Sequence, residues 1–585
     1  MKKRNNIIIH FCFFLTLISS ILSLNGCDKK QQEQSPQKSF LEFTNEIFRE
    51  QVTSDTISLH YVLADPKNFG IGEITPSLGE FSAKQMQENA SICKEYLTTL
   101  KSYDYEQLTK EEQLIYDCLK SSLELDSSMA DDIYLQEALG PTSGLQAQLP
   151  ILFAEYAFNS KKDIEDYILL LYDLGRYYSE VEEFEREKSK RGYFMSDETA
   201  DAIIKQCQSF IENPEQNFLI QCFSEKLNDV KELSKDDKIL LEEKNRDAVL
   251  ESVIPAYQSL IDTLTALKGT GKSTRGLCGY DGGKKYYEKM AQSNTGSSKS
   301  VKEMKQALNN EYKACMTTMA MLQQKNPNIL DEFDSIQYPV NEPKEIIEYL
   351  KKAIQNDFPL LEEVSYSIKY FHESLQDHLN PAMYLIPPID DANQNNIYIN
   401  PKSQNQNEQL FSTLAHEGYP GHLYQNVYLR KINPAPIRRL LSPTGYEEGW
   451  ATYVEAYSYE LAGLEESMAT LLSANTIAFQ CLYSLTDIGI NYDGWDLNDT
   501  LSFWMPLGID RETVEEIYLS MASEPCVYLP YAIGCLEFLE LRESAEDELG
   551  DKFSLKEFHT FLMNLGPAPF DIIEEHMEQW IDTIK

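Results

Sequence analysis

The chain has few histidines and tryptophans, and positive charge is scarce. Among 585 residues there are only eight histidines and four tryptophans. Its 52 lysines and arginines stand against 93 acidic residues, which gives a formal net charge of -41. Because proteins bind nucleic acids mainly through lysine and arginine, this imbalance argues against a nucleic-acid partner. It also argues against a broad electrostatic attachment to anionic lipid.

Cysteine lacks any recognisable spacing. None of the 11 cysteines forms a CxxC pair, so neither a zinc–thiolate site nor a disulfide framework is indicated. We expect most of the cysteines to be small buried hydrophobic residues. Internal repeats are absent from the sequence, and strand-like alternation is scarce.

The first residues have the pattern of an export signal. Three basic residues precede an apolar run from Ile7 to Leu24, and the run ends in LNGC at Cys27. This ending resembles a bacterial lipobox, so we predict a lipoprotein signal peptide over residues 1–27 and a lipid on Cys27 that anchors the chain to the cell membrane. Residues 28–39 are polar and predict a disordered tether. The alternative is an uncleaved anchor helix, and either way the body is extracytoplasmic.

The rest of the chain predicts a mostly α fold. Apolar residues recur every three or four positions, as in Ile164 to Tyr178. The clearest strand candidate is Asn396 to Asn400, a small element before a helix. Residues 269–285 are rich in glycine and predict a linker between an N-terminal helical half, 40–268, and a C-terminal half, 286–585.

The strongest chemical signal is the segment HEGYPGH, which contains two of the eight histidines. Zinc hydrolases need imidazole ligands and a carboxylate that takes a proton from water. His416 and His422 are six residues apart, which is about 600° on a regular helix, so an unbroken helix cannot bring them together. Gly418 to Gly421 (GYPG) predict a kink or two-residue bulge that returns His422 to the side of His416. The alternative is that Pro420 ends one helix and His422 caps the next.

A third ligand is expected from the segment Tyr446 to Glu460. Glu448 lies 26 residues after His422, and Glu455 follows one heptad later, on the same helix face. We interpret Glu448 as a ligand and Glu455 as the partner of a ligand imidazole. Glu447 is a possible substitute for Glu448, and a solvated acidic face is the alternative without function.

The motif HEGYPGH followed by EGWATYVE resembles a bacterial family known as domain of unknown function 885, which is placed among the gluzincin-type metallopeptidases. Further segments resemble the family in order and spacing, so the likeness covers nearly the whole chain after the tether. These segments are Gly140 to Tyr156, Tyr483 to Trp495, Glu524 to Arg542, and Phe558-His559 before Leu565-Gly566.

The resemblance implies a helical fold distantly similar to thimet oligopeptidase and Taq-type carboxypeptidase, with two helical halves around a channel. It also implies Zn²⁺ as the cofactor and an oligopeptide as the substrate. Carried over to this sequence, the resemblance implies that the zinc ligands are His416, His422 and Glu448. It implies that Glu417 is the general base, which later donates the proton.

Other residues carry weaker implications. Tyr531 matches the family's Pro-x5-Tyr-x2-Gly and is the candidate donor to the oxyanion. Tyr528 is the alternative donor, and a buried core tyrosine is the alternative without function. Many relatives have histidine where this chain has Asn491, which argues against a substrate-binding role there. Arg511 and Arg542 could hold a peptide carboxylate, but structural ion pairs explain them better.

The predicted function is therefore zinc-dependent hydrolysis of oligopeptides outside the cytoplasmic membrane. Two alternatives stay open: a lipoprotein that binds peptide or metal without turnover, and a metal-dependent amidohydrolase that acts on cell-wall peptides. Sequence alone does not separate endopeptidase from carboxypeptidase action, or zinc from manganese or cobalt. Five further histidines are expected to be satisfied core or surface residues: His60, His372, His378, His559 and His576.

Overall fold

The fold is predominantly helical, with one small sheet, as predicted. The computed structural model describes residues 38–585 apart from 232, 274, 334–335, 372–375, 377–380, 392–393 and 403–409. The predicted signal peptide and the predicted tether up to residue 37 lie outside the described residues. None of the described helices is both long and apolar enough to cross a membrane.

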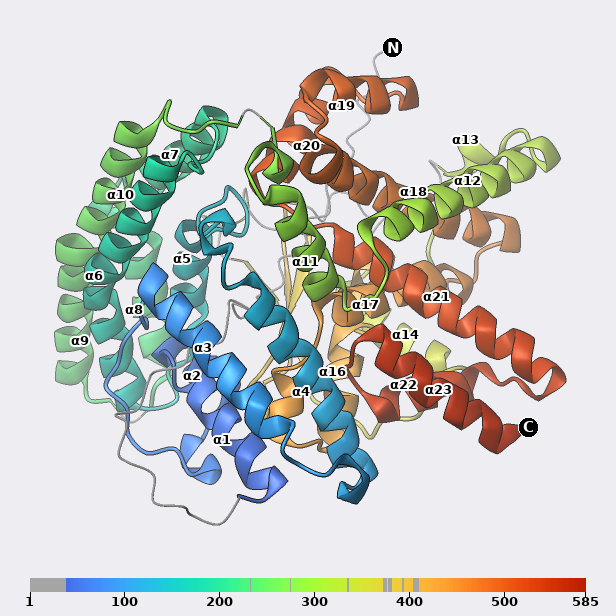
Figure 1. Ribbon diagram of the computed structural model, residues 1–585, viewed down its shortest axis with the longest axis horizontal. Coiled ribbons are helices and arrows are strands. Elements are labelled where there is room, and N and C mark those ends of the chain that lie inside the picture. The colour runs from blue at the N-terminus through green and yellow to red at the C-terminus, as the bar shows by residue number, and fades with distance from the viewer. Residues whose placement is uncertain are drawn as a thin grey trace.

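The N-terminal helices form a layered array that Figure 1 shows in blue and green. Helices α6 to α10 pack side by side at the left of this view, while α1 to α4 lie in front of the molecule. Their bounds are α1 (Phe40–Val52), α2 (Thr56–Val62), α3 (Ala83–Leu100), α4 (Lys110–Met129), α5 (Leu145–Glu155), α6 (Lys161–Arg191), α7 (Asp197–Ile211), α8 (Phe218–Asp229), α9 (Lys235–Ala248) and α10 (Ile254–Leu267).

The C-terminal part surrounds the HEGYPGH segment with long helices, and α12 projects from the body at the upper right of Figure 1. The elements before the motif are α11 (Gly283–Thr295), α12 (Val301–Lys325), α13 (Ile329–Phe333), α14 (Pro343–Ala353), β1 (Ser367–Tyr370), β2 (Ala382–Leu385) and β3 (Asn396–Ile399). Those that follow are α15 (Leu410–Glu417), α16 (His422–Ile432), α17 (Thr444–Leu461), α18 (Glu466–Ile488), α19 (Leu497–Trp504), α20 (Arg511–Ser523), α21 (Leu529–Leu549), α22 (Leu555–Leu565) and α23 (Phe570–Ile584).

Local sequence signals explain where the helices start. Helix α1 begins at Phe40, after a capping box in which Ser39 and Glu42 satisfy each other's backbone N–H groups. Helix α6 contains the predicted segment 164–178, starts with a capping box at Ser160 and ends at Gly192, whose φ of 79° favours glycine. These caps satisfy backbone groups that the helix termini leave without partners.

The sheet lies directly before the motif helix. Its strand order is β1-β3-β2, with β1 parallel and β2 antiparallel to β3. The predicted strand at 396–400 is therefore confirmed as β3. Strands β1 and β2 were not predicted, because four residues such as SIKY or AMYL are too short to show a period of two clearly. Through β2 the sheet contacts α15, and this contact positions backbone groups beside the motif.

Helices α17 and α21 cross closely at the centre of the molecule. A Cβ atom on Gly534 of α21 would lie 1.9 Å from the carbonyl oxygen of Gly445 on α17, so only glycine allows this approach. One turn later, Phe538 packs against Trp450 with ring centroids 5.6 Å apart. This crossing fixes the helix that carries Glu448 against the helix that carries Tyr531.

Hydrophobic contacts extend across the predicted linker. Leu114 and Cys118 of α4 belong to the cluster that contains Trp450, and Ile437 joins the cluster of α1 to α4. The division into residues 40–268 and 286–585 stays a prediction. The nine described cysteines are all free, and seven of them are buried, as expected of small core residues.

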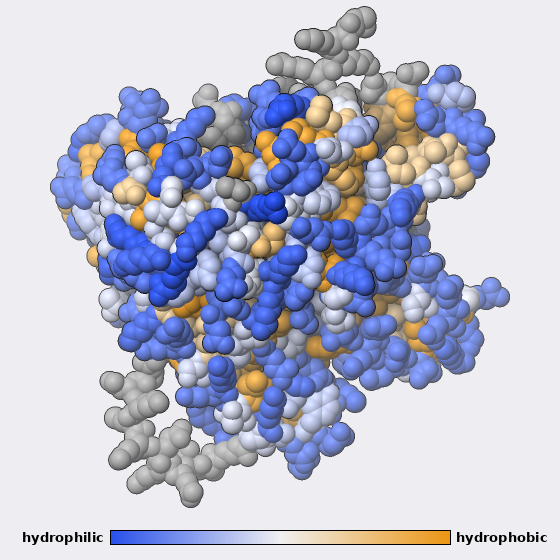
Figure 2. All heavy atoms as spheres, turned by 45° about the horizontal axis from the view of Figure 1, so that its top comes forward, coloured by the Kyte–Doolittle hydropathy of each residue, from blue (hydrophilic) through white to orange (hydrophobic). Residues whose placement is uncertain are grey.

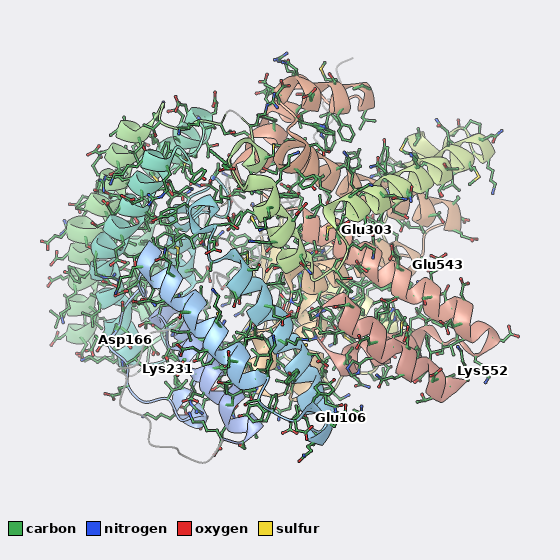
Figure 3. The ribbon with its side chains drawn as sticks, in the orientation of Figure 1. Glu106, Asp166, Lys231, Glu303, Glu543 and Lys552 are labelled. Carbon is green, nitrogen blue, oxygen red and sulfur yellow. The ribbon has the colours of Figure 1, made fainter. Side chains whose placement is uncertain are left out.

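The surface is strongly polar. Figure 2 shows hydrophilic side chains over most of the visible face, with apolar side chains in smaller areas. Figure 3 labels charged side chains such as Glu106, Glu303 and Glu543, which are exposed at the surface. This distribution agrees with the net charge of -41.

Candidate metal centre

The turn between α15 and α16 brings the two motif histidines together. The N–H of Gly421 donates to the Ala415 carbonyl at 2.9 Å, and the N–H of Tyr424 donates to the Gly418 carbonyl at 3.1 Å. Both bonds span six residues, two more than a helical hydrogen bond. The backbone therefore contains the two extra residues that the spacing required, and the His416 and His422 rings lie with centroids 4.8 Å apart.

Glycine and tryptophan hold this turn in place. A Cβ atom on Gly421 would lie 1.7 Å from the His416 carbonyl oxygen, so no larger residue fits there. The turn contains a cis peptide between Tyr419 and Pro420. The indole N–H of Trp450 on α17 donates to the Pro420 carbonyl at 2.9 Å. The turn is thus attached to the helix that supplies the acidic residues.

Three side chains converge as a candidate ligand set. The Nε2 atoms of His416 and His422 lie 3.5 and 3.7 Å from Oε2 of Glu448. One ligand atom from each residue can be chosen so that all lie within 4.8 Å of one another, and all three residues are buried. Atoms bound at about 2.0–2.1 Å to one tetrahedral ion lie about 3.3 Å apart, so the two histidine–glutamate distances are close to those of a tetrahedral metal site.

The environment of Glu448 fits a cation. Its side chain is completely buried, and neither carboxylate oxygen has a hydrogen-bond partner within the described part of the chain. Burial alone would raise the pKa of Glu448, but the two imidazoles lower it below its usual range. A buried charge without hydrogen bonds is costly unless it is paired or coordinates a metal. A divalent ion between the two histidines and Glu448 would supply that compensation.

Glu455 supports one ligand from behind. Its Oε2 atom lies 3.1 Å from Nδ1 of His416, while Nε2 of the same ring faces Glu448. A carboxylate in this position fixes the tautomer and orientation of a ligating imidazole. The three residues of α17 on this face, Glu448, Thr452 and Glu455, are all buried, so the solvated acidic face is wrong.

Glu417 lies beside the ligand set but is not part of it. Its Oε2 atom accepts the backbone N–H of Tyr384, on strand β2, at 2.7 Å. Burial raises the pKa of Glu417, against the lowering caused by the two histidines and by the Tyr384 N–H. A carboxylate with a raised pKa is suited to accept and return a proton near neutral pH. The small sheet therefore places a fixed donor on the candidate base.

Comparison with known proteins identifies the family. The model described as "Bacterial protein of unknown function (DUF885)" matches residues 67–577. The chain belongs to this family. The comparison with curated proteins finds no match.

Two solved structures share the fold of this DUF885 member. A candidate lipoprotein from Colwellia psychrerythraea is 20% identical, with a TM-score of 0.83 over 94% of this chain and 99% of that one. A candidate lipoprotein of unknown function from Shewanella oneidensis is 18% identical, with a TM-score of 0.65 over 92% and 100%. A candidate oligoendopeptidase F from Bacillus anthracis strain Ames is 11% identical over 84% and 96%, and its TM-score of 0.30 is too low to carry an argument.

The tyrosine assignments stay predictions. Tyr531 is buried on α21, one turn before Gly534, and so lies on the side of α21 that faces α17. Tyr528 stacks on Tyr483 with centroids 5.2 Å apart in an apolar cluster. Asn491 is fully buried and holds the Leu277 N–H and the Met521 carbonyl, which is a structural role.

Three features near the centre were missed from the sequence: the Tyr384 N–H and the side chains of Arg430 and Arg439. The backbone donor has no sequence signal, because any residue of a strand supplies one. The paired arginines at 438 and 439, shortly before the Glu448 helix, were a visible signal. The two arginines considered from the sequence as carboxylate binders form exposed or half-exposed ion pairs, Arg511 with Glu515 and Arg542 with Glu546.

The other described histidines are satisfied outside the centre. His60 accepts the Ala157 N–H at 3.1 Å and stacks on Tyr156. His559 contacts the Tyr453 hydroxyl at 2.9 Å, and burial lowers its pKa to about 3. His576 is half-buried on α23. His372 and His378 lie outside the described residues.

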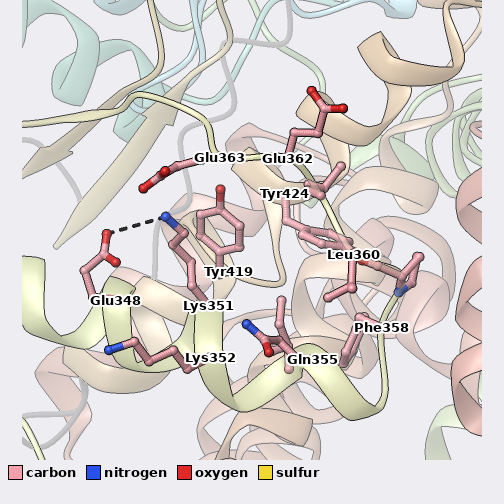
Figure 4. A pocket seen from close by; sticks show the side chains of 13 residues that line it. Glu348, Lys351, Lys352, Gln355, Phe358, Leu360, Glu362, Glu363, Tyr419 and Tyr424 are labelled. Carbon is pink, nitrogen blue, oxygen red and sulfur yellow. Dashed lines mark hydrogen bonds and ion pairs between the residues drawn. The ribbon is translucent and has the colours of Figure 1, made fainter.

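A pocket of about 270 Å³ adjoins the motif turn (Figure 4). Tyr419 and Tyr424 line it from the motif side, and Lys351 lies across it with its ammonium 3.6 Å from Glu348. None of the three candidate ligands lines this pocket. It is therefore distinct from the metal centre, although the two share the turn.

Replacing Glu455 by glutamine should weaken metal binding without abolishing it. The variant loses the negative partner of His416, and such outer partners typically contribute about 10–100-fold to metal affinity. Competition with a chromogenic chelator measures the change. Glu460→Gln, an exposed position on the same helix, is the matched control and should leave affinity unchanged. Equal affinities in both variants would contradict the role of Glu455.

Proposed function

We propose that this DUF885 protein is a zinc-dependent peptidase that hydrolyses peptide bonds in oligopeptides. The observation that carries the proposal is the buried set of His416, His422 and Glu448 with Glu417 beside it. A bound zinc ion would lower the pKa of a water molecule and polarise the scissile carbonyl. The protein side chains would hold the ion, and Glu417 would accept and donate the proton.

Glu417 performs the proton transfers in this scheme. Its carboxylate accepts a proton from the attacking water and later gives it to the leaving amine. The Tyr384 N–H keeps one carboxylate oxygen in place during both transfers. Tyr531 is proposed to donate a hydrogen bond to the developing oxyanion, since it lies on the face of α21 toward α17.

We also propose that the protein acts outside the cytoplasmic membrane, held by a lipid on Cys27. The lipobox-like sequence supports this location, and two proteins with the same fold are described as candidate lipoproteins. The strong negative charge makes short peptides a better class of substrate than nucleic acids.

A peptide digest tests the function directly. The full-length protein is incubated with a defined mixture of oligopeptides, and new termini are identified by mass spectrometry. We expect cleavage that a zinc chelator such as 1,10-phenanthroline abolishes and added zinc restores. If the zinc-loaded protein binds peptides but releases no fragments, the protein is a binding lipoprotein and the proposal is wrong.

A further inference from the structure

Two arginines near the metal centre form no ion pair with any acidic side chain that the structure describes. Arg430 lies on α16, about two turns after His422, and donates to the Asp391 carbonyl and, at 2.6 Å, to Oδ1 of Asn395. Arg439 ends the short helix η9 (Pro436–Arg439), and its guanidinium has no hydrogen bond or ion pair with any part of the chain that the structure describes. The neighbouring Arg438 is different, because its guanidinium is buried and donates to the carbonyls of Leu565 and Pro567.

Contacts through Tyr384 connect this arginine pair to the candidate base. The backbone N–H of Tyr384 donates to Glu417 at 2.7 Å, and its hydroxyl donates to Oδ1 of Asn395 at 2.8 Å. The same Asn395 oxygen accepts from Arg430. Arg439 lies within electrostatic range of Tyr384, Arg430 and Glu447. Tyr384 thus lies between the guanidinium of Arg430 and the candidate base Glu417.

The setting of Arg439 favours an anion. Burial, followed by the like charge of Arg430, lowers the pKa of Arg439 to about 10. A guanidinium that has lost water and lies near a second one is stabilised when a carboxylate binds between them. Its planar fork matches a carboxylate with two parallel hydrogen bonds.

We propose that Arg439, assisted by Arg430, binds the C-terminal carboxylate of the substrate, so that the enzyme is a carboxypeptidase. This inference rests on the proposed peptidase function. An extended residue spans about 3.3–3.6 Å, so an anchor at a fixed distance from the metal centre selects a bond at a fixed number of residues from the C-terminus. One water adds across that C–N bond, which leaves a new carboxylate on the long fragment and a free amine on the released piece.

Matched peptides with a free or an amidated C-terminus test the anchor. The full-length, zinc-loaded protein is assayed on both, and kcat/KM is measured by mass spectrometry. We expect the free acid to exceed the amide by about 100-fold, because the amide cannot form the charged bidentate contact. Arg439→Gln should lower kcat/KM for the acid by a similar factor and leave the amide unchanged. Arg511→Gln, an exposed arginine paired with Glu515, is the control and should alter neither rate.

Three other outcomes separate the anchor from the peptidase function. Equal rates for acid and amide in the unaltered protein would overturn the anchor and leave an endopeptidase. If a folded, zinc-loaded Arg439→Gln protein still prefers the free acid over the amide, Arg439 is not the residue that binds the carboxylate. If neither peptide is cut, the peptidase function fails, and calorimetric binding to the Glu417→Gln protein decides about the anchor. If the Glu417→Gln protein binds the free acid and the amide with equal affinity, the proposed carboxylate anchor is wrong.

Discussion

Replacing His422 by alanine is expected to remove zinc from the protein. Nε2 of His422 is one of three candidate ligand atoms, and no other described His, Cys, Asp or Glu group forms an alternative set. The loss should exceed the about 10–100-fold effect of an outer partner such as Glu455. Elemental analysis should find about one zinc per chain in the unaltered protein and almost none in the variant.

The control for this experiment is His576→Ala. His576 is half-buried on α23 and is not part of the ligand set, so its removal should leave the zinc content unchanged. Glu448→Gln should also lose zinc, because the amide keeps the shape of the side chain but lacks its charge. If zinc stays bound in both His422→Ala and Glu448→Gln, the metal centre is somewhere else.

The sequence carried enough information to predict that His416, His422 and Glu448 converge as candidate ligands, because the turn between the histidines depends on local backbone chemistry. Two histidines six residues apart can meet only if the backbone between them has two residues more than a helical turn, and Gly418, Pro420 and Gly421 permit such a turn. The two hydrogen bonds that span six residues show this turn in the structure. The seven-residue spacing from Glu448 to Glu455 likewise predicts that both carboxylates lie on the same face of one helix.

The parts that could not be predicted depend on contacts between distant segments. The Tyr384 N–H reaches Glu417 only because β2 pairs with β3 and lies against α15. Arg439 is significant because it forms no ion pair within the described part of the chain, and no local sequence pattern reveals that. The approach of α17 to α21 depends on Gly445 and Gly534, which are 89 residues apart in the sequence.

Replacing Glu417 by glutamine is expected to abolish hydrolysis while leaving zinc in place. Glu417 lies outside the ligand set, so the metal content should stay at about one per chain. The amide side chain cannot accept a proton from water, and general-base catalysis typically contributes about 10²–10⁴-fold. We therefore expect kcat to fall by about 1,000-fold with KM nearly unchanged, measured on the best peptide from the digest.

The combination of these two results distinguishes an enzyme from a binding protein. A fall in kcat with zinc retained assigns the proton transfer to Glu417, whereas a fall with zinc lost would mean that the variant disturbs the site. Glu460→Gln is the control for removing a carboxylate, since this exposed residue lies on α17 away from the ligand face. Full activity in Glu417→Gln would exclude Glu417 as the base. The buried carboxylate that accepts the Tyr384 N–H would then have to be explained by its contact with β2 alone.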